Sequence, residues 1–232
     1  QVLKDHLQKS HKIAAFILEP LVQGASGMRM CRPQFIHDVI NLVRDNNILV
    51  IFDEVMTGFG RTGTFFALDQ LHITPDFLCL SKGLTGGFLP LALTVTSEKI
   101  YESFLGDDFQ TAFAHGHSYT ANPLACRAGL TSLALLQKPR CQRAIKNIHK
   151  IHTKELQKLQ EIPLVEKIRL MGTIAAFDIK NPPMDLRQRF YEKGLLLRPL
   201  GKTVYILPPY CMTSQELHKA YESIRDVLHV LT

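Results

Sequence analysis

Short runs of consecutive apolar residues recur in the first hundred positions of the chain, and most of them end at a polar residue. The runs cover residues 13–18, 48–52, 77–80 and 91–95. Uninterrupted apolar runs of this length are typical of strands that are buried on both faces of a sheet. The pattern therefore predicts four such strands in the first part of the chain.

A helical period separates the first two runs. Pro33 suits the first turn of a helix, and Ile36, Val39, Ile40 and Val43 then follow at helical spacing. Strand, helix and strand in this order are typical of a parallel sheet with right-handed crossovers. The first part of the chain is therefore predicted to be an α/β domain with a mostly parallel sheet.

The pattern becomes helical from Pro123. One face of a long helix that ends before Pro163 is formed by Ile145, Ile148, His152, Leu156 and Leu159. Three further strands are predicted at 174–179, 195–197 and 204–207. The residues 213–216 (TSQE) form a capping box, which predicts the start of a last helix. Its buried stripe is predicted to consist of Leu217, Ala220, Tyr221, Ile224, Val227, Leu228 and Leu231.

These elements predict a division of the chain into three parts. The α/β part covers residues 1–134, a connecting helix covers 135–162, and a small α+β domain covers 163–232. No internal repeat is visible in the sequence.

The composition places the chain among globular proteins. Of its 232 residues, 46% are hydrophobic and 21% are charged, which excludes a disordered chain. No apolar run approaches the roughly 18 residues of a membrane span, and no signal segment opens the sequence. The net charge of +6 is spread along the chain, with the densest basic run between Lys138 and Lys154. We expect a solvated helix face there and no nucleic-acid surface, because no aromatic residues interleave.

The cysteines and histidines predict neither disulfides nor a metal site. The five cysteines are widely spaced and form no CxxC pair, so reduced thiols in the cytoplasm are the simplest account. His115 and His117 have no third ligand at metal-binding spacing. No metal is therefore expected.

Candidate chemistry lies directly after three of the predicted strands, at Glu19, Asp53 and Lys82. Ligands of parallel α/β sheets bind beyond the carboxyl ends of the strands. A lysine and an acid facing one ligand suit pyridoxal phosphate, whose aldehyde bonds to a lysine and whose ring nitrogen pairs with an acid. An ordinary salt bridge between Asp53 and Lys82 is the alternative explanation of this pair alone.

Longer stretches of sequence resemble class III pyridoxal-phosphate aminotransferases. DEVMTGFGRTG and SKGLTGG are specific to this class, whereas VQGASGM and RPLGKTVYILPPY point to its branch in biotin synthesis. The matching stretches lie at 19–28, 53–63, 75–87, 115–126 and 198–210. The resemblance implies a fold-type I transferase that works as a homodimer with sites at the subunit interface. Residues 1–134 would then be the C-terminal part of the large cofactor-binding domain.

The resemblance also implies roles for individual residues. Lys82 corresponds to the lysine that bonds to the cofactor, and Asp53 to the acid on the pyridine nitrogen. Ser118 stands where the family usually has Thr, and its hydroxyl would reach the cofactor phosphate of the neighbouring subunit. Arg198 corresponds to the arginine that binds the substrate carboxylate, and a surface ion pair is its alternative explanation. Tyr205 and Arg61 correspond to residues at the substrate, although each also suits a structural role.

The substrates implied are S-adenosylmethionine as amino donor and 8-amino-7-oxononanoate as acceptor, and lysine is an alternative donor. Two departures from the class stand out. Met56 replaces a glutamine that hydrogen-bonds near the cofactor ring. Ala25 and Ser26 stand near the position where ornithine and 4-aminobutyrate transaminases carry a glutamate that shields the arginine corresponding to Arg198. An unshielded Arg198 favours the biotin branch.

Two rival interpretations remain open, and a third fits the sequence badly. The chain could be another class III transaminase, for acetylornithine, 4-aminobutyrate or a diamine, or a non-catalytic fragment. A nucleotide-binding domain is disfavoured, because no GxGxxG or GxxxxGK[ST] stretch follows a strand. The matching stretches cover about the C-terminal half of the family's chain, and the sequence starts at Gln1. We therefore expect an absent N-terminal half, without which these residues would bind cofactor poorly and turn over nothing.

Overall fold

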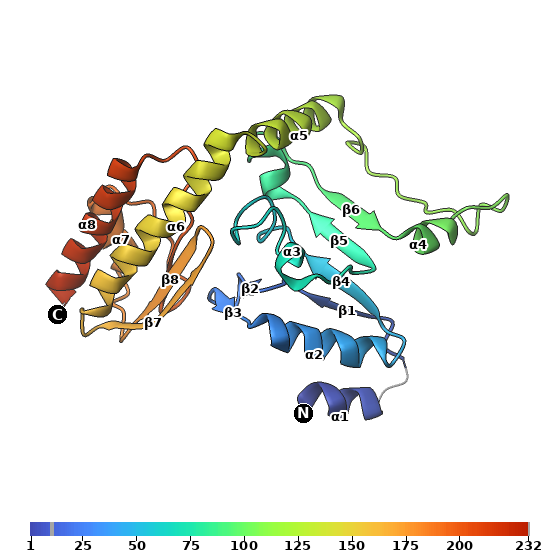
Figure 1. Cartoon of the computed structure of the whole chain (residues 1–232), viewed down its shortest axis with the longest axis horizontal. Coiled ribbons are helices and arrows are strands. Elements are labelled where there is room, and N and C mark those ends of the chain that lie inside the picture. The colour runs from blue at the N-terminus through green and yellow to red at the C-terminus, as the bar shows by residue number, and fades with distance from the viewer. Residues whose placement is uncertain (10–11, 232) are drawn as a thin grey trace. The chain divides into compact units, whose positions relative to one another are not determined.

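The computed structural model describes residues 1–9 and 12–231, which fall into two compact units (Figure 1). Unit 1 consists of residues 1–21, 32–59 and 67–135, and unit 2 of residues 22–31, 60–66 and 136–232. Thr232, the end of the predicted C-terminal domain, lies outside the described residues. The three-part division of the chain stays a prediction.

Unit 1 contains a four-stranded sheet with the order β1-β4-β5-β6. The strands are β1 (Ala15–Leu18), β4 (Leu49–Asp53), β5 (Phe77–Leu80) and β6 (Leu93–Thr96). All four predicted strands are confirmed, and β1, β4 and β5 are parallel. In contrast, β6 runs antiparallel to β5. The connection between them contains only a short 3-10 helix, η1 (Lys82–Thr85), and no α-helical crossover of the kind that usually joins parallel strands.

Five helices belong mainly to unit 1: α1 (Val2–Lys9), α2 (Pro33–Arg44), α3 (Leu68–Leu71), α4 (Glu98–Glu102) and α5 (Pro123–Leu136). The predicted helix between the first two strands is confirmed as α2. Pro33 opens it, and Ile36, Ile40 and Val43 are completely buried. The predicted helix from Pro123 is confirmed as α5.

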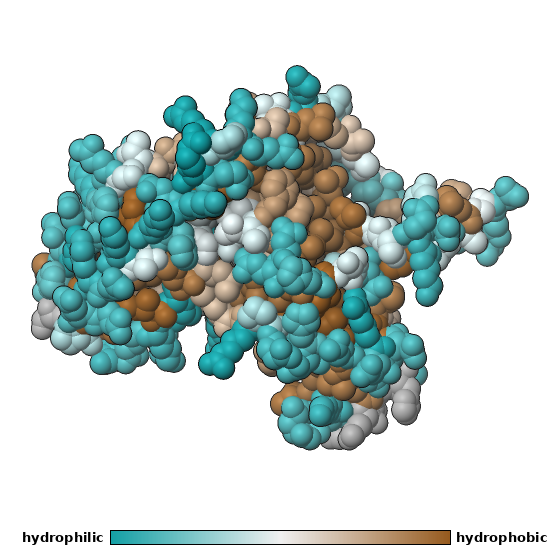
Figure 2. All heavy atoms as spheres, in the orientation of Figure 1, coloured by the Kyte–Doolittle hydropathy of each residue, from teal (hydrophilic) through white to brown (hydrophobic). Residues whose placement is uncertain are grey.

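One face of the sheet in unit 1 is exposed, which corrects the prediction of strands buried on both faces. In β4 the side chains alternate, so that Val50 and Phe52 are buried whereas Leu49 is exposed. Ile17 in β1, which lies on the same face as Leu49, is 60% exposed. Val95 of the edge strand β6 lies on the other face, in the row of Phe52, and is 48% exposed. A parallel sheet needs cover on both faces, and unit 1 covers only one. Figure 2 shows apolar side chains at the surface in the region of β5, β6 and α5.

Unit 2 contains an antiparallel sheet with the order β7-β8-β9, and a separate small hairpin of β2 (Val22–Gln23) and β3 (Arg29–Met30). The strands of the sheet are β7 (Val165–Met171), β8 (Ile174–Ile179) and β9 (Thr203–Ile206). The predicted strands at 174–179 and 204–207 are confirmed.

The predicted strand at 195–197 is wrong, and β7 was not predicted. The N–H of Leu195 bonds to the carbonyl of Phe190, so this segment closes the end of helix α7 (Leu186–Glu192) after Gly194 at φ 76°. In β7, charged residues interrupt the apolar ones, and a register shift between Glu166 and Arg169 breaks the alternation.

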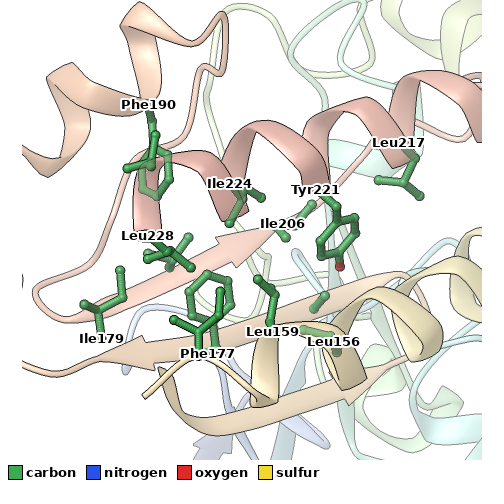
Figure 3. Close-up of a cluster of buried hydrophobic side chains, with 14 of the residues drawn as sticks. Leu156, Leu159, Phe177, Ile179, Phe190, Ile206, Leu217, Tyr221, Ile224 and Leu228 are labelled. Atoms are coloured by element: carbon green, nitrogen blue, oxygen red, sulfur yellow. The ribbon is translucent and has the colours of Figure 1, made fainter. Parts of the chain in front are cut away.

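The core of unit 2 lies between one face of this sheet and its helices (Figure 3). The predicted long helix is confirmed as α6 (Pro139–Gln160), and all five predicted core residues on it are buried. The last helix is confirmed as α8 (Ser214–Leu231), with Tyr221 completely buried. The capping box forms as predicted. The Thr213 hydroxyl accepts the Glu216 N–H at 3.2 Å, and the Glu216 carboxylate accepts the Thr213 N–H at 2.8 Å.

A buried histidine joins α6 to α8 and to the sheet. Nε2 of His152 lies 3.2 Å from the carbonyl oxygen of Thr173, and Nδ1 lies 2.6 Å from the hydroxyl of Tyr221. A carbonyl only accepts, so Nε2 carries the proton and Nδ1 accepts from the tyrosine. Burial lowers the pKa of His152 from 6.5 to about 4. The neutral ring is therefore the form that fits the core.

This burial predicts a loss of stability in mild acid. The unfolded imidazole takes up a proton near pH 6.5, whereas the folded one takes it up only near pH 4. The contribution of the neutral His152 ring to the free energy of unfolding is complete above pH 6.5. It falls by about 3 kcal/mol as the pH drops to 4. Urea unfolding of the wild type and of His152→Gln should show a difference that shrinks between these two pH values. Parallel stability curves would contradict the assignment.

Among the described residues, no helix is both long enough and apolar enough to cross a membrane.

Candidate functional site

Two predicted site residues of unit 1 lie at the same edge of its sheet. Asp53 ends β4, and Lys82 comes two residues after the end of β5. Because β4 and β5 are neighbouring parallel strands, both residues lie at the carboxyl edge, where ligands of α/β sheets bind. Asp53 is half-buried and accepts the N–H of Val55 at 3.0 Å. Among the described residues, neither side chain takes part in an ion pair.

The local sequence presents Lys82 in a fixed backbone geometry. The hydroxyl of Ser81 donates to the carbonyl of Leu91 at 2.7 Å, which ties down the residue before it. Lys82 itself has φ 44°, a left-handed conformation that is strained for a residue with a side chain. A Cβ at Gly83 would lie 2.8 Å from the Cβ of Phe59, so only glycine fits there. Lys82 is thereby held with its side chain exposed.

Glu54 is a buried acid that the sequence interpretation did not single out. Its carboxylate accepts the N–H groups of Ala67 at 2.7 Å and Leu68 at 2.8 Å, and the hydroxyl of Thr57 at 3.2 Å. Burial raises its pKa, and these hydrogen bonds counteract the rise. Glu54 therefore organises the backbone after β4. The signal was present, since a second acid follows the strand-ending Asp53 directly.

Ser118 lies in an arm of unit 1, residues 103–121, that is exposed along its whole length (Figure 1). Alternate side chains of this arm form a row of rings. The rings of Phe113 and His115 stack at 5.7 Å between centroids, and those of His115 and His117 at 6.5 Å. Among the described residues, no group of three or more possible ligands could hold a metal ion. Ser118 is thus an exposed residue of this arm.

The other predicted site residues, Arg198, Tyr205 and Arg61, belong to unit 2. Arg198 is exposed, and no ion pair among the described residues includes it. Tyr205 is half-buried in β9, where its partner in the register is Ala176 of β8. Val204 and Ile206 point into the core, so Tyr205 belongs to the opposite face of the sheet. Tyr205 is thus available to a ligand on this face, and Arg198 is accessible from solvent.

Arg61 is engaged within unit 2. Its Nη1 donates to the carbonyl of Pro208 at 2.7 Å, and its guanidinium lies 4.7 Å from the ring centroid of Tyr210. Burial raises the pKa of Tyr210 to about 12. These contacts attach the segment 60–66 to the residues after β9. The assignment of Arg61 to the substrate stays a prediction.

Two backbones touch where the segment 60–66 meets the turn between β7 and β8. A Cβ at Gly172 would lie 2.3 Å from the backbone nitrogen of Gly63, and Gly172 has φ 55°. The N–H of Thr173 bonds to the carbonyl of Arg61 at 2.9 Å. Glycine is required at position 172 for both space and conformation.

Gly172→Ala should therefore destabilise unit 2 more than an ordinary glycine substitution. Overpacking against the backbone and a left-handed alanine together should cost about 3 kcal/mol. Gly194→Ala is the matched control, because φ is 76° and no atom lies within 4 Å of an added Cβ, so about 1 kcal/mol is expected. Urea unfolding of both variants makes the comparison. Equal losses would contradict the close approach.

A family model described as aminotransferase class-III matches residues 1–228. The chain belongs to this family, whose members depend on pyridoxal phosphate. It is 49% identical over 224 residues to the adenosylmethionine-8-amino-7-oxononanoate aminotransferase of Synechococcus elongatus, covering 93% of this chain and 52% of the relative. The enzyme of the same name from Helicobacter pylori is 39% identical, covering 99% and 55%. The chain spans about half the length of the curated relatives it matches.

Solved structures give the same family. An aminotransferase of Bacillus anthracis superposes with a TM-score of 0.91 at 26% identity, covering 98% of this chain and 55% of that one. Adenosylmethionine-8-amino-7-oxononanoate aminotransferase of Methanocaldococcus jannaschii superposes with a TM-score of 0.84 at 34% identity, covering 97% and 56%. The predicted family and its fold-type I architecture are thus confirmed.

The residues of unit 1 fit this cofactor chemically. An exposed amine and a half-buried carboxylate stand at one edge of the sheet, and neither is neutralised by an ion pair among the described residues. A carboxylate without a cation suits a protonated ring nitrogen, and an accessible amine suits an aldehyde. Asp53 and Lys82 therefore have the chemistry that the cofactor requires.

Proposed function

We propose that the protein transfers an amino group from S-adenosylmethionine to 8-amino-7-oxononanoate, giving 7,8-diaminononanoate for biotin synthesis in the cytoplasm. The observation that carries the proposal is the position of Asp53 and Lys82 at the carboxyl ends of neighbouring parallel strands. Support for the substrates comes from the names of relatives that are up to 49% identical. Transamination of acetylornithine, 4-aminobutyrate or a diamine is the alternative.

When bound, pyridoxal phosphate supplies an aldehyde that takes up the amino group and a ring that draws electrons from the neighbouring carbon. In the proposal, Nζ of Lys82 would hold the cofactor through its aldehyde carbon. As a free amine, Nζ would act as the general base that holds or moves a proton at the donor carbon. Asp53 keeps the ring nitrogen protonated through its opposite charge. The hydroxyl of Ser118 donates to the phosphate bound in the neighbouring subunit of a homodimer.

Arg198 and Tyr205 of unit 2 form the substrate half of the proposal. A guanidinium fork binds a carboxylate through two parallel hydrogen bonds, and 8-amino-7-oxononanoate carries one carboxylate. The ring of Tyr205 contacts the carbon chain of the acceptor. Arg61 contributes to the same half, either at the substrate or through Pro208 and Tyr210.

We further propose that the complete protein contributes residues beyond these 232. The chain spans about half the length of its curated relatives. The exposed apolar face of unit 1, with Ile17 and Leu49, is an area that further residues of the protein would cover. The cofactor site would then receive groups that the present chain does not supply.

The test is a half-reaction followed through the absorbance of the bound cofactor. The complete protein, loaded with pyridoxal phosphate, is mixed with S-adenosylmethionine or with lysine in the absence of acceptor. We expect S-adenosylmethionine to bleach the band and 8-amino-7-oxononanoate to restore it. Bleaching of the band by lysine but not by S-adenosylmethionine would overturn the assignment of the donor. Restoration only by the oxo partners of ornithine, 4-aminobutyrate or diamines would overturn the acceptor.

A further inference from the structure

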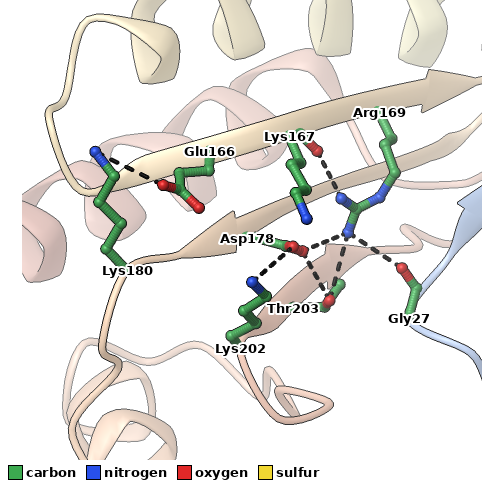
Figure 4. A network of polar contacts seen from close by, with 8 residues as sticks. All are labelled: Gly27, Glu166, Lys167, Arg169, Asp178, Lys180, Lys202 and Thr203. Carbon is green, nitrogen blue, oxygen red and sulfur yellow. Dashed lines mark hydrogen bonds and ion pairs between the residues drawn. The ribbon is translucent and has the colours of Figure 1, made fainter.

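Arg169 of β7 attaches the β2–β3 hairpin to the three-stranded sheet of unit 2 (Figure 4). Its Nη2 donates to the carbonyl oxygen of Gly27 at 3.1 Å and to Oδ1 of Asp178 at 2.7 Å. The same nitrogen lies 3.4 Å from Oγ1 of Thr203, and Nη1 donates to the carbonyl of Lys167 at 2.6 Å. One guanidinium thus connects all three strands of the sheet with the hairpin.

Asp178 orients this guanidinium. It is 4% exposed and accepts from Arg169 and from the hydroxyl of Thr203 at 2.8 Å. Nζ of Lys202 lies 3.9 Å from its other oxygen. Burial alone would raise the pKa of Asp178, but the hydrogen bonds from Arg169 and Thr203 hold it below its usual value. The acid is charged at neutral pH and keeps Arg169 in a single orientation.

The turn at the tip of the hairpin has little freedom against β9. The N–H groups of Gly27 and Met28 both bond to the carbonyl of Gly24, at 3.2 and 3.1 Å. Gly27 has φ 86°, and a Cβ there would lie 3.0 Å from Oγ1 of Thr203. The turn therefore lies directly on the strand, with no space for a larger residue between them.

Tyr205 shares the face of the sheet to which the turn is attached. Arg169 pairs with Ala176 in the register of β7 and β8, and Ala176 pairs with Tyr205 in that of β8 and β9. Residues directly opposite each other on adjacent strands point to the same face. Only the small side chain of Ala176 stands in the row between the arginine and the tyrosine.

We infer that Arg169 is a positioning residue, which fixes the turn 24–28 on the face of the sheet that carries Tyr205 and thereby sets the affinity for the oxo acid acceptor. The inference rests on the proposed function for the role of Tyr205, whereas the attachment of the turn does not depend on it. Arg169 acts through the Gly27 carbonyl and makes no contact with the acceptor. Without its hydrogen bond, the turn leaves its place on the face that carries Tyr205, the ring proposed to bind the acceptor.

Arg169→Lys is the central variant, because lysine keeps the charge but has no planar fork for several acceptors. The double variant Arg169→Met/Asp178→Leu is the second, because replacing both members of a buried ion pair by apolar residues often preserves stability. Arg189→Lys is the matched control. Arg189 forms an ion pair with Asp185 at 3.0 Å at the surface of the same unit.

The first measurement is hydrogen exchange of the amides of Gly27 and Met28 in this chain. A charged hydrogen bond is strong enough that we expect about tenfold faster exchange in both Arg169 variants. The Arg189→Lys control should exchange like the wild type. Unchanged exchange in the Arg169 variants would overturn the attachment of the turn, whatever the protein catalyses.

The second measurement is steady-state kinetics of the complete protein. We expect the KM for 8-amino-7-oxononanoate to rise about tenfold in both Arg169 variants, with kcat changed much less, because acceptor binding is weakened uniformly. A faster-exchanging turn with an unchanged KM would overturn the positioning role and leave a structural one. Failure of the proposed function is recognised separately, since the wild type would then not turn over this acceptor while the exchange measurement stays valid.

Discussion

Lys82→Ala should abolish the covalent attachment of pyridoxal phosphate and lower transamination by at least about 10⁴-fold, the upper range of general acid–base catalysis. In the proposed function the amine of Lys82 bonds to the aldehyde and moves the proton, and alanine lacks this amine. The loss should be close to complete. Among the described residues of the stretches that resemble the family, Lys82 is the only lysine at this edge of the sheet.

The measurement combines absorbance with chemical trapping in the complete protein. Borohydride makes a bond between lysine and aldehyde permanent, so mass spectrometry of peptides should find the cofactor on Lys82 of the wild type. No peptide of Lys82→Ala should carry it. Lys99→Ala is the control, because Lys99 is an exposed lysine of the same unit in α4. The backbone of Ser81 and Gly83 should keep its shape, so a normal melting temperature is expected for both variants.

Trapped cofactor on another lysine of the wild type would contradict the assignment and move the reacting amine elsewhere. A surviving visible band in Lys82→Ala would do the same. If the wild type takes up no cofactor even at high concentration, the fragment interpretation gains support instead. These outcomes differ in whether the wild type itself is coloured, so they can be distinguished.

The residues at strand ends could be predicted from the sequence because one rule joins sequence to space. Parallel strands end at a common edge, so a polar residue after each apolar run lies near its counterparts. Asp53 and Lys82 follow this rule, and the structure places them accordingly. The local sequence pattern was sufficient to predict the positions of these two residues. It was also sufficient to predict the capping box at Thr213.

Contacts that join distant segments could not be predicted in this way. Residues 22–31 and 60–66 belong to unit 2 although the sequence around them belongs to unit 1. Gly172 against Gly63, and Arg169 against Gly27, depend on how separate segments pack. Single residues carry no periodic signal for such contacts. The only sequence signal of these contacts was a glycine or an arginine for which the local pattern gave no reason.

The strands at 165–171 and 195–197 show the same limit at a smaller scale. In β7, Arg169 bonds across the sheet to Asp178 and Glu166 pairs with Lys180, so charged residues break the apolar pattern. The run at 195–197 is apolar, yet its first N–H closes the end of α7 at Phe190. Apolar pattern identifies buried residues well, but tertiary hydrogen bonds decide which of them form strands.

Arg198→Met should raise the KM for 8-amino-7-oxononanoate by about 10²-fold or more, the range expected when a charged partner of a carboxylate is lost. The structure gives Arg198 a defined place. Pro199 follows it, and Leu200 and Thr203 then close a turn through hydrogen bonds of 2.8 and 3.0 Å. Because Arg198 is exposed just before this turn, its loss should leave the fold unchanged.

Arg198→Lys separates charge from geometry, because lysine retains the positive charge but lacks the fork that binds both oxygens. We expect its KM to lie between those of the wild type and Arg198→Met. Arg187→Met is the matched control, since Arg187 is also an exposed arginine of unit 2 outside the ion pairs of the described residues. It should bind acceptor like the wild type.

The comparison also tests which member of the family this protein is. An acceptor without a carboxylate, such as an amino-aldehyde, should react equally well with the wild type and Arg198→Met. A selective loss for the oxononanoate therefore ties the guanidinium to the carboxylate itself. Equal KM values of the wild type and Arg198→Met for the oxononanoate would mean that another cation binds the acceptor. That result would leave the proposed roles of Lys82 and Asp53 unchanged, because the proposal places those two residues at the cofactor and not at the acceptor's acid group.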